Sequence, residues 1–426
     1  MENRKKLGIA LSFHPSITSP SFYFPISIFQ FRVSNFHPEV SMDYGFTEYQ
    51  RAIQGLAREI AEKEIRPVAA EYDREAKFPW PIVKILAQTD LFRVFIDEKY
   101  GGNGMGFMEG TLVIEQIAKV HTSWRMAFNM QCWGPSLTIQ KFGTEEQKQH
   151  YIPKFVSGEY IGSFAMTEAD VGSDVAGMKC LAEDREDHYL LNGNKMWITN
   201  GTVSNHGLLY VKTNKEAGAN GITCFIMDYS LPGITRKKIH EKVGLLASDT
   251  AEITFEDVKV PKKLVLGTVN KGFQMCMTQL NSTRLGCSAG ALGLSGAILE
   301  ASIKYANERS QFGQKIGKFQ LIQQQIAEMK MGHAAMADLV YKAAWLKDKG
   351  LPNVMETSMS KLYGAKEVVH AANECMKLFG SFGYSDEYPC GRFLRDAKQF
   401  ETLEGTSNMH TMIVANAALG YAPNRV

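Results

Sequence analysis

The spacing of apolar residues divides the chain into regions of different character. From residue 42 to about 162, apolar residues recur at every third or fourth position, which predicts amphipathic helices. The first such run contains Ile53, Leu56, Ile60, Ile65 and Val68. After Gly272 the helical period returns and predicts long helices, one through Leu292–Tyr305 and others over 319–346, 354–379 and 406–419. Four long helices with short connections favour an antiparallel four-helix bundle.

The region between the two helical parts has a β pattern. Short runs rich in aromatic and β-branched residues predict strands at 163–167, 189–193, 195–199, 207–211, 221–227 and 250–255. A tight turn is predicted at Asn192-Gly193, because this dipeptide favours hairpin turns. Short strands at this spacing favour a small antiparallel β-barrel or sandwich. The chain is therefore predicted to be α+β, with a helical domain over 42–162, a β domain over 163–275 and a helical bundle over 276–426.

Residues 1–41 follow neither pattern. They are rich in Ser, Pro and Phe, carry four basic residues against two acidic ones, and hold no regular period. They are interpreted as an extension upstream of a start at Met42, or as a leader segment. The protein is expected in the cytoplasm of a prokaryote, or in the mitochondrial matrix if the segment is a leader.

Composition excludes several classes of function. The 47 Lys and Arg residues nearly balance 45 Asp and Glu residues, so a general nucleic-acid binder is not expected. The seven cysteines and ten histidines have no CxxC, HxxxH or HExxH spacing, so no metal site and no disulfide framework are expected. No uninterrupted apolar run reaches the roughly 20 residues of a membrane span.

Polar residues gather in four segments, 167–174, 197–201, 306–313 and 401–408. Trp197 could stack beside a planar cofactor or pack in the core. Arg309 could bind a diphosphate in a bidentate manner or interact with the end of a helix. Glu404 could be a general base or a solvated, capping side chain. Each segment taken alone leaves these alternatives open.

Together the segments resemble the acyl-CoA dehydrogenase family over about residues 44–421. The motifs are TEADVGSD, KMWITNG, TRLGCSAGALGL, ERSQFGQKIGKFQ, FGSFGYSDEYP and RDAK…ETLEGTSN, in the order of that family. The motifs are closest to the glutaryl-CoA and benzylsuccinyl-CoA dehydrogenase branch. The resemblance implies the family's fold, a homotetramer, an acyl-CoA substrate and electron transfer to an electron-transferring flavoprotein.

The resemblance also implies a site for FAD between the β domain and the C-terminal helices. One part of that site would consist of Phe164, Met166, Thr167, Gly172, Ser173, Trp197 and Thr199. A neighbouring subunit would contribute Arg309, Phe312, Gln320, Lys377, Gly380 and Gly383. Thr406 and Asn408 would contact the cofactor after the catalytic loop.

By the same resemblance Glu404 is the base that removes the α-proton while a hydride leaves the β-carbon. In other branches the base precedes the arginine that is Arg284 here, and Thr283 at that position cannot serve. Arg284, Ser173 and Gly405 would bind the CoA thioester.

Arg125 falls where the glutaryl-CoA branch has an arginine for the distal carboxylate of its substrate. Leu403 stands where decarboxylating members commonly have Tyr, so oxidation with the carboxylate retained is expected. Short, branched or cyclic acyl-CoA substrates, including benzylsuccinyl-type ones, stay open as alternatives. So do an acyl-CoA oxidase and a non-catalytic, nucleic-acid-binding relative.

Overall fold

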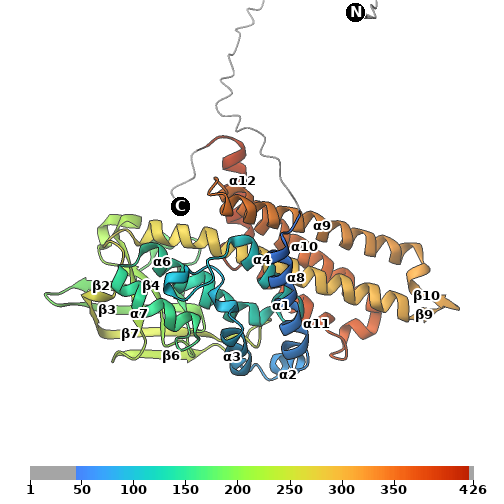
Figure 1. Cartoon of the computed structure of the whole chain (residues 1–426), viewed down its shortest axis with the longest axis horizontal. Helices are drawn as coiled ribbons and strands as arrows, with labels where there is room; N and C mark the ends of the chain where they lie inside the picture. The colour runs from blue at the N-terminus through green and yellow to red at the C-terminus, as the bar shows by residue number, and fades with distance from the viewer. Residues whose placement is uncertain (1–44, 422–426) are drawn as a thin grey trace, which may run out of the picture. The chain divides into compact units, whose positions relative to one another are not determined.

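The computed structural model describes residues 45–421, and it contains a helical region, a β region and a second helical region in the predicted order (Figure 1). The extension predicted over residues 1–41 lies outside the described residues. The general fold prediction is confirmed, whereas one turn, one domain limit and the composition of the bundle differ from it.

The N-terminal region consists of short helices with well-defined starts. A capping box begins α1 (Glu48–Ile60): the Thr47 hydroxyl accepts from Gln50 N, and the Gln50 side chain accepts from Thr47 N. The helices that follow are α2 (Ala69–Arg74), α3 (Trp80–Gln88), α4 (Phe107–Val120), α5 (Thr122–Gln131), α6 (Leu137–Phe142) and α7 (Glu145–Val156). All ten residues of α5 are buried, so this helix lies inside the protein and can present side chains to an interior site.

The β region is a mixed sheet with the strand order β6-β7-β3-β2-β4-β5-β8, and β1 pairs with β4. The bounds are β1 (Phe164–Ala165), β2 (Leu181–Asp184), β3 (His188–Thr199), β4 (His206–Lys212), β5 (Ile222–Asp228), β6 (Ile234–Lys238), β7 (Thr250–Pro261) and β8 (Val265–Leu266). The β1·β4 and β2·β4 pairs are parallel, and the others are antiparallel. The prediction of a β domain is confirmed, but the sheet is not wholly antiparallel.

Asn192 and Gly193 do not form the predicted turn, because both lie inside β3. A bulge in the pairing with β7 occurs at this point. Asn192 bonds with Asp257 instead of closing a hairpin, since its Nδ2 donates to Asp257 Oδ1 (3.0 Å) and its Oδ1 accepts from Asp257 N (2.9 Å). A Cβ on Gly193 would lie 2.7 Å from Cys180 Sγ, so glycine is required by packing against β2.

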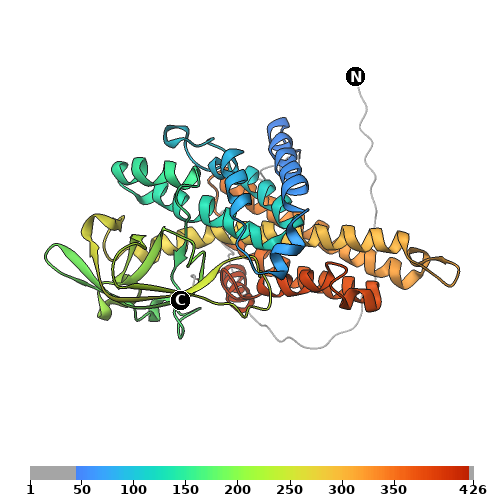
Figure 2. The same cartoon turned by 90° about the horizontal axis from the view of Figure 1, so that it is seen from below.

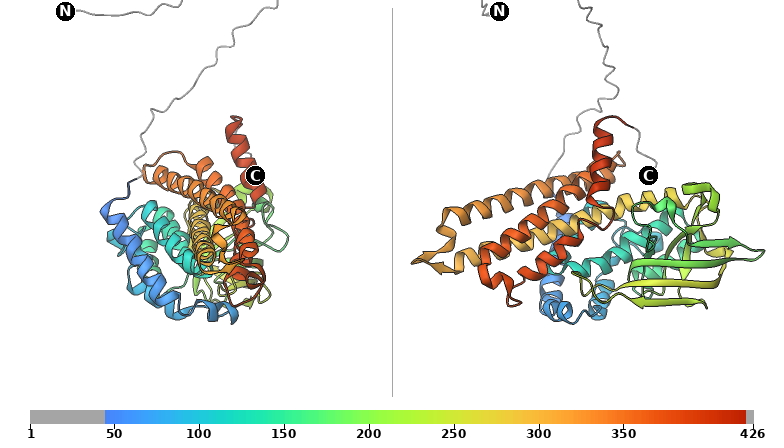
Figure 3. Two further views of the ribbon diagram at one scale, coloured as in Figure 1. Left: turned by 90° about the vertical axis from the view of Figure 1, so that its right-hand side faces the viewer. Right: turned by 180° about the vertical axis from the view of Figure 1, so that it is seen from behind.

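Three long helices dominate the C-terminal region and pack on one another: α8 (Gly272–Glu308), α9 (Gln320–Asp348) and α10 (Val354–Phe379) (Figures 2 and 3). The predicted fourth long helix is the short α12 (Ser407–Ala418), and an unpredicted helix, α11 (Cys390–Gln399), precedes it. The helix α4 from the first region also packs on α8. The domain limit predicted at residue 276 falls inside α8, which starts at Gly272.

By length and composition, α8 is the one helix among residues 45–421 that could span a membrane, although no uninterrupted apolar run was found in the sequence. However, 72% of its most apolar 18-residue window is buried within the protein. The apolar character of α8 is explained by its position, because α4, α9 and α10 all pack on it. It is the central core helix of the chain.

A buried ion pair fixes the start of the β region. Lys195 Nζ donates to Glu168 Oε1 (2.9 Å) and to the Met166 carbonyl oxygen (2.8 Å). The Lys195 side chain is fully buried, and that of Glu168 is 9% exposed. Glu168 also accepts from the backbone of Lys179 and Cys180, at 2.7 and 3.0 Å. These bonds join the segment after β1 to β3 and to the start of β2.

We predict that Lys195→Met lowers the free energy of unfolding by about 3–5 kcal/mol, because it leaves the Glu168 carboxylate buried without its cation. Urea unfolding at neutral pH measures the change. The double variant Lys195→Met/Glu168→Gln should recover much of the loss. As a control, Lys179→Met removes a surface ion pair to Asp170 and should cost about 0–1 kcal/mol. Equal losses in the two single variants would contradict the prediction.

Candidate active site

Glu404 lies in the loop between α11 and α12 and adopts an unusual backbone conformation. Its φ is 59°, and Gly405 after it has a φ of 95°, so two consecutive residues are left-handed. For a glutamate this conformation is disfavoured and needs support from its surroundings. Thr406 then caps α12 by accepting from Met409 N (3.4 Å).

Side chains from three helices hold this loop through its carbonyl groups. Arg284 Nε, from α8, donates to the Glu404 carbonyl oxygen at 3.0 Å. His410 Nε2, from α12, lies 3.1 Å from the same oxygen. Lys361, a buried lysine of α10, donates from Nζ to the Gly405 carbonyl oxygen at 2.6 Å. The loop is thereby fastened from both sides, which explains how its conformation is maintained.

The carboxylate of Glu404 has a separate partner, the hydroxyl of Thr283 on α8. Thr283 Oγ1 donates to Glu404 Oε2 at 2.7 Å. Burial raises the pKa of Glu404 above its ordinary value. The hydrogen bond from Thr283 opposes this rise in pKa, as do the positive charges of Arg284, Arg125 and Lys361. Burial on one side, and the hydrogen bond and positive charges on the other, thus act on the pKa of this carboxylate in opposite directions.

His410 is a neutral partner in this arrangement. Burial, together with the nearby positive charges of Arg284 and Lys361, lowers its pKa to about 3. A neutral imidazole has one N–H, and its bond to the Glu404 carbonyl oxygen requires that hydrogen on Nε2. His410 therefore positions the loop without adding a charge beside the carboxylate.

Arg125 on α5 is fully buried, yet its guanidinium has no hydrogen-bond partner among residues 45–421. Its Cζ lies 5.1 Å from the centre of the Phe400 ring. Burial lowers its pKa, while the nearby negative charges of Glu404 and Asp396 oppose that change. A buried cation without a hydrogen-bonded anion is costly, so this residue indicates a place for an anionic group close to Glu404.

Five of the residues predicted for the flavin come from two segments of the β region: Phe164, Met166 and Thr167 from β1 and the residues after it, and Trp197 and Thr199 from the end of β3. Met196 N donates to the Thr167 carbonyl oxygen at 2.8 Å, which brings the two segments side by side. A bulge between Lys195 and Ile198 turns Trp197 outward, with a φ of 62° and 56% exposure. An indole held out in this way offers an uncovered flat surface, which fits stacking beside a planar ring.

This cluster lies next to α8, the helix whose Thr283 and Arg284 side chains bind Glu404. Met166 Sδ is 2.9 Å from Cys276 Sγ on α8, and Glu404 is close enough to contribute to the raised pKa of the Cys276 thiol, which is caused mainly by burial. Gly172 and Ser173 follow in an exposed loop, where a Cβ on Gly172 would meet no atom within 4 Å. The base and the residues expected at the flavin are thus brought to one part of the chain, with open space beside the loop.

The residues predicted for the diphosphate and adenosine are not brought to this place. Arg309, Phe312, Gln320, Lys377, Gly380 and Gly383 lie around the far end of α8, near β9 (Ser310–Gln311) and β10 (Gln314–Lys315). Figure 1 shows β9 and β10 at the opposite end of the long helices from the sheet. Because α8 has 37 residues, its two ends are about 55 Å apart. Within one chain these residues cannot reach a cofactor beside Trp197.

The distal residues nevertheless form a cluster of their own. Phe312 is 93% exposed and has a φ of 50°. Arg309 Cζ lies 5.7 Å from the centre of the Phe382 ring, and Lys377 pairs with Glu374 at 2.5 Å. Phe312 is therefore an exposed aromatic residue in a cluster that also contains cationic side chains. Asn408 is also exposed, at the start of α12.

Two residues that hold the Glu404 loop, Lys361 and His410, were not predicted from the sequence. Lys361 lies in an otherwise apolar and small-residue stretch of α10, and a buried lysine there is the one signal that could have revealed it. His410 is one turn into α12, and nothing in its spacing predicts that it points back to Glu404.

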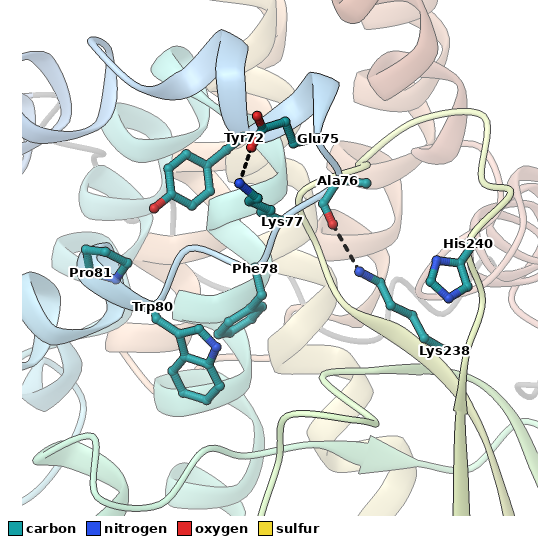
Figure 4. A pocket seen from close by; sticks show the side chains of 9 residues that line it. All are labelled: Tyr72, Glu75, Ala76, Lys77, Phe78, Trp80, Pro81, Lys238 and His240. Carbon is teal, nitrogen blue, oxygen red and sulfur yellow. Dashed lines mark hydrogen bonds and ion pairs between the residues drawn. The ribbon is translucent and has the colours of Figure 1, made fainter.

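A separate cavity of about 560 Å³ lies between α2, α3 and β6 (Figure 4). It contains none of the predicted site residues. Its lining consists of Tyr72, Glu75, Ala76, Lys77, Phe78, Trp80, Pro81, Lys238 and His240. Lys238 Nζ closes one side by donating to the Ala76 carbonyl oxygen at 3.0 Å. The cavity therefore contributes no residue to the candidate site around Glu404.

The three regions and the carboxylate loop define an acyl-CoA dehydrogenase, an oxidoreductase that acts on acyl-CoA. Three family models match the chain: the N-terminal domain over 47–159, the middle domain over 163–258 and the C-terminal domain over 270–419. The chain belongs to the acyl-CoA dehydrogenase family, whose members are flavoproteins.

Among its relatives, the chain is similar to the glutaryl-CoA dehydrogenase of Desulfococcus multivorans, with 40% identity over 384 residues that cover 89% of this chain and 98% of the relative. It is also similar to a short-chain specific acyl-CoA dehydrogenase of Clostridium acetobutylicum, with 34% identity over 88% of this chain and 99% of the relative. A solved glutaryl-coenzyme A dehydrogenase in complex with glutaryl-CoA matches with a TM-score of 0.87 and 38% identity, over 90% of this chain and 98% of that one. The relatives therefore include enzymes with different acyl substrates.

We predict that Thr283→Val shifts the acid limb of flavin reduction by substrate to higher pH. The variant removes a hydrogen bond that favours the ionised carboxylate, so the pKa of Glu404 rises and less base is ionised at low pH. A hydrogen bond to a charged group contributes about 1.5–3 kcal/mol, so reduction at the acid end should slow about tenfold or more. Stopped-flow bleaching over about pH 5 to 9 measures this.

The control for this experiment is Thr278→Val, which removes a hydroxyl of the same helix that bonds only to Gln274 O. It should leave the pH profile unchanged. Glu404→Gln should retain FAD and lose reduction at every pH. An unshifted profile in Thr283→Val would contradict the role assigned to its hydroxyl.

Proposed function

We propose that this protein oxidises a dicarboxylyl-CoA, with glutaryl-CoA as the best candidate, to the corresponding 2,3-enoyl-CoA. The observation that carries this proposal is the buried guanidinium of Arg125, which lacks a hydrogen-bonded partner and lies within electrostatic range of Glu404. A distal carboxylate of the substrate would supply the missing anion. A substrate without that carboxylate would leave the cation unpaired, which favours the dicarboxylyl class over short monocarboxylyl substrates.

Glu404 is proposed as the base that takes the α-proton. Arg284, His410 and Lys361 bind the carbonyl oxygens of Glu404 and Gly405 and hold the loop in its left-handed conformation. The carboxylate would therefore be kept in one place for the transfer of the proton. Arg284 binds the Glu404 loop, and Gly405 is part of that loop. Together with Ser173, from the loop beyond β1, these residues would bind the thioester and CoA portion of the substrate. Glu404 is half-buried, and its carboxylate accepts from Thr283 of α8.

FAD is the proposed cofactor, and it would supply the acceptor for the hydride that leaves the β-carbon. Phe164, Met166, Thr167, Trp197 and Thr199 would hold its ring, with Gly172, Thr406 and Asn408 nearby. The exposed indole of Trp197 beside the Thr167 segment supports this fit. The distal cluster of Arg309, Phe312, Gln320, Lys377, Gly380 and Gly383 would complete the site of a neighbouring subunit in a homotetramer.

The remaining partners and the location are proposed from the family resemblance. The electron acceptor would be an electron-transferring flavoprotein. The protein would act in the cytoplasm of a prokaryote, or in the mitochondrial matrix if residues 1–41 are a leader.

We predict that glutaryl-CoA reduces, and so bleaches, the flavin faster than butyryl-, isovaleryl- or cyclohexanecarboxyl-CoA does. Arg125→Gln should lower kcat/KM for glutaryl-CoA about 100-fold or more and leave butyryl-CoA within about threefold, because only the dicarboxylyl substrate loses a charge-assisted contact. Stopped-flow reduction of the FAD-loaded enzyme under anaerobic conditions measures both. Equal losses for the two substrates would refute the role of Arg125.

We also predict that the product of glutaryl-CoA keeps its carboxylate, so that glutaconyl-CoA accumulates. Loss of CO2 leaves a carbanion that must be protonated, and Leu403 beside the base is a half-buried apolar residue packed against the core, with no proton to donate. Glutaryl-CoA labelled at its distal carboxyl tests this. Release of label as CO2 in proportion to flavin reduction would overturn it.

A further inference from the structure

Two polar side chains of α5, Arg125 and Asn129, lie one turn apart on the same face and rest on two glycines of α8 that are also one turn apart. A Cβ on Gly290 would lie 2.2 Å from Arg125 Cδ. A Cβ on Gly286 would lie 3.3 Å from Asn129 Nδ2 and 3.4 Å from its Oδ1. The two glycines therefore make room for two long polar side chains in the contact between the helices.

Asn129 makes no hydrogen bond through either amide atom to residues 45–421. The residue is 1% exposed, its Oδ1 is buried without a donor, and its Nδ2 is a donor without an acceptor. Gln131 on the same helix shows the usual situation: its Nε2 donates to the carbonyl oxygens of Phe155 (2.9 Å) and Tyr160 (2.7 Å), and its Oε1 accepts from Gly162 N (2.7 Å). A buried amide left unpaired costs about 1–3 kcal/mol, so Asn129 calls for an explanation that packing does not supply.

Asn129 of α5 lies beside Gly286 of α8, and the place of Gly286 along α8 relates Asn129 to Glu404. Thr283, which binds the Glu404 carboxylate, lies on the same face of α8 as Gly286 and Gly290. With a rise of 1.5 Å per residue, Gly286 is about 4–5 Å and Gly290 about 10 Å beyond Thr283 along the helix. The base, the amide and the guanidinium thus follow one another in a line.

A glutaryl chain fits this line. Its distal carboxylate carbon is three carbon–carbon bonds of about 1.5 Å each from the α-carbon at which Glu404 would act. Adding one hydrogen-bond length at each end, of about 3 Å, gives a span of roughly 10 Å. The carboxylate would then lie between Asn129 and Arg125, within reach of both side chains.

We propose that Asn129 is a second ligand of the substrate's distal carboxylate and a specificity-determining residue beside Arg125. This inference rests on the proposed function and extends it. The two oxygens of the carboxylate would be divided, with the guanidinium donating to the outer oxygen and the Asn129 amide N–H donating to the oxygen nearer the base. The neutral amide adds a donor without adding a second buried charge.

The test uses Asn129→Leu, of similar size, in the FAD-loaded enzyme, with glutaryl-CoA and valeryl-CoA as substrates of equal chain length. We expect kcat/KM for glutaryl-CoA to fall about 10–100-fold, the range for one hydrogen bond to a charged group, and valeryl-CoA to stay within about threefold or to improve. Asn129→Asp should lower glutaryl-CoA oxidation further, because two carboxylates repel, and Asn129→Ser should retain part of the activity as a shorter donor.

Flavin content and the thermal midpoint of unfolding are measured for each variant. If Asn129→Leu does not fold, Asn129→Ser replaces it as the test variant. An unchanged kcat/KM for glutaryl-CoA, or equal losses for both substrates, overturns the role of Asn129. If Arg125→Gln lowers glutaryl-CoA oxidation selectively while the Asn129 variants do not, the proposed function stands and only this inference fails. If the parent enzyme does not prefer glutaryl-CoA over valeryl-CoA, both fail.

Discussion

The positive charges that several helices bring close to one carboxylate, that of Glu404, are the interaction on which the candidate site depends. Burial raises the pKa of this carboxyl and so disfavours its ionised form. The opposing influences come from separate helices, with Thr283 and Arg284 on α8, Arg125 on α5 and Lys361 on α10. These helices must converge on one loop to keep the carboxylate ionisable, and α8 is the common element to which α4, α9 and α10 pack.

A hydrogen bond also connects the β region to the helix that precedes the Glu404 loop. The Lys195–Glu168 pair fixes the segment that follows β1, and Leu245 N donates to Asp396 Oδ1 of α11 at 2.7 Å. The second bond joins the segment before β7 to the helix that leads into the Glu404 loop. The surface around Trp197 and the base are therefore held by the same framework, and the buried polar contacts, not the apolar core alone, fix their relation.

Much of the fold was predictable because the hydrophobic period is strong, and α10 has the predicted bounds of 354–379. Asn192-Gly193 shows where local propensity failed, because the pairing of β3 with β7 and the bond to Asp257 outweighed the turn preference. Arg125 and Glu404 were predicted from resemblance, but the missing partner of Arg125 is visible only in three dimensions. Lys361 and His410 could not be predicted, since their contacts with the loop join distant parts of the chain.

The unsatisfied groups of α5 suggest how such a site would select its substrate. Arg125 and Asn129 are already buried and already positioned by the glycines of α8, so binding a dicarboxylyl substrate would require little reorganisation. A monocarboxylyl substrate would occupy the same space and leave the guanidinium and the amide without partners. Discrimination then comes mainly from the penalty for the wrong acyl group, because the polar groups cannot turn to water. Such a site loses stability in the free protein and regains it when the carboxylate binds.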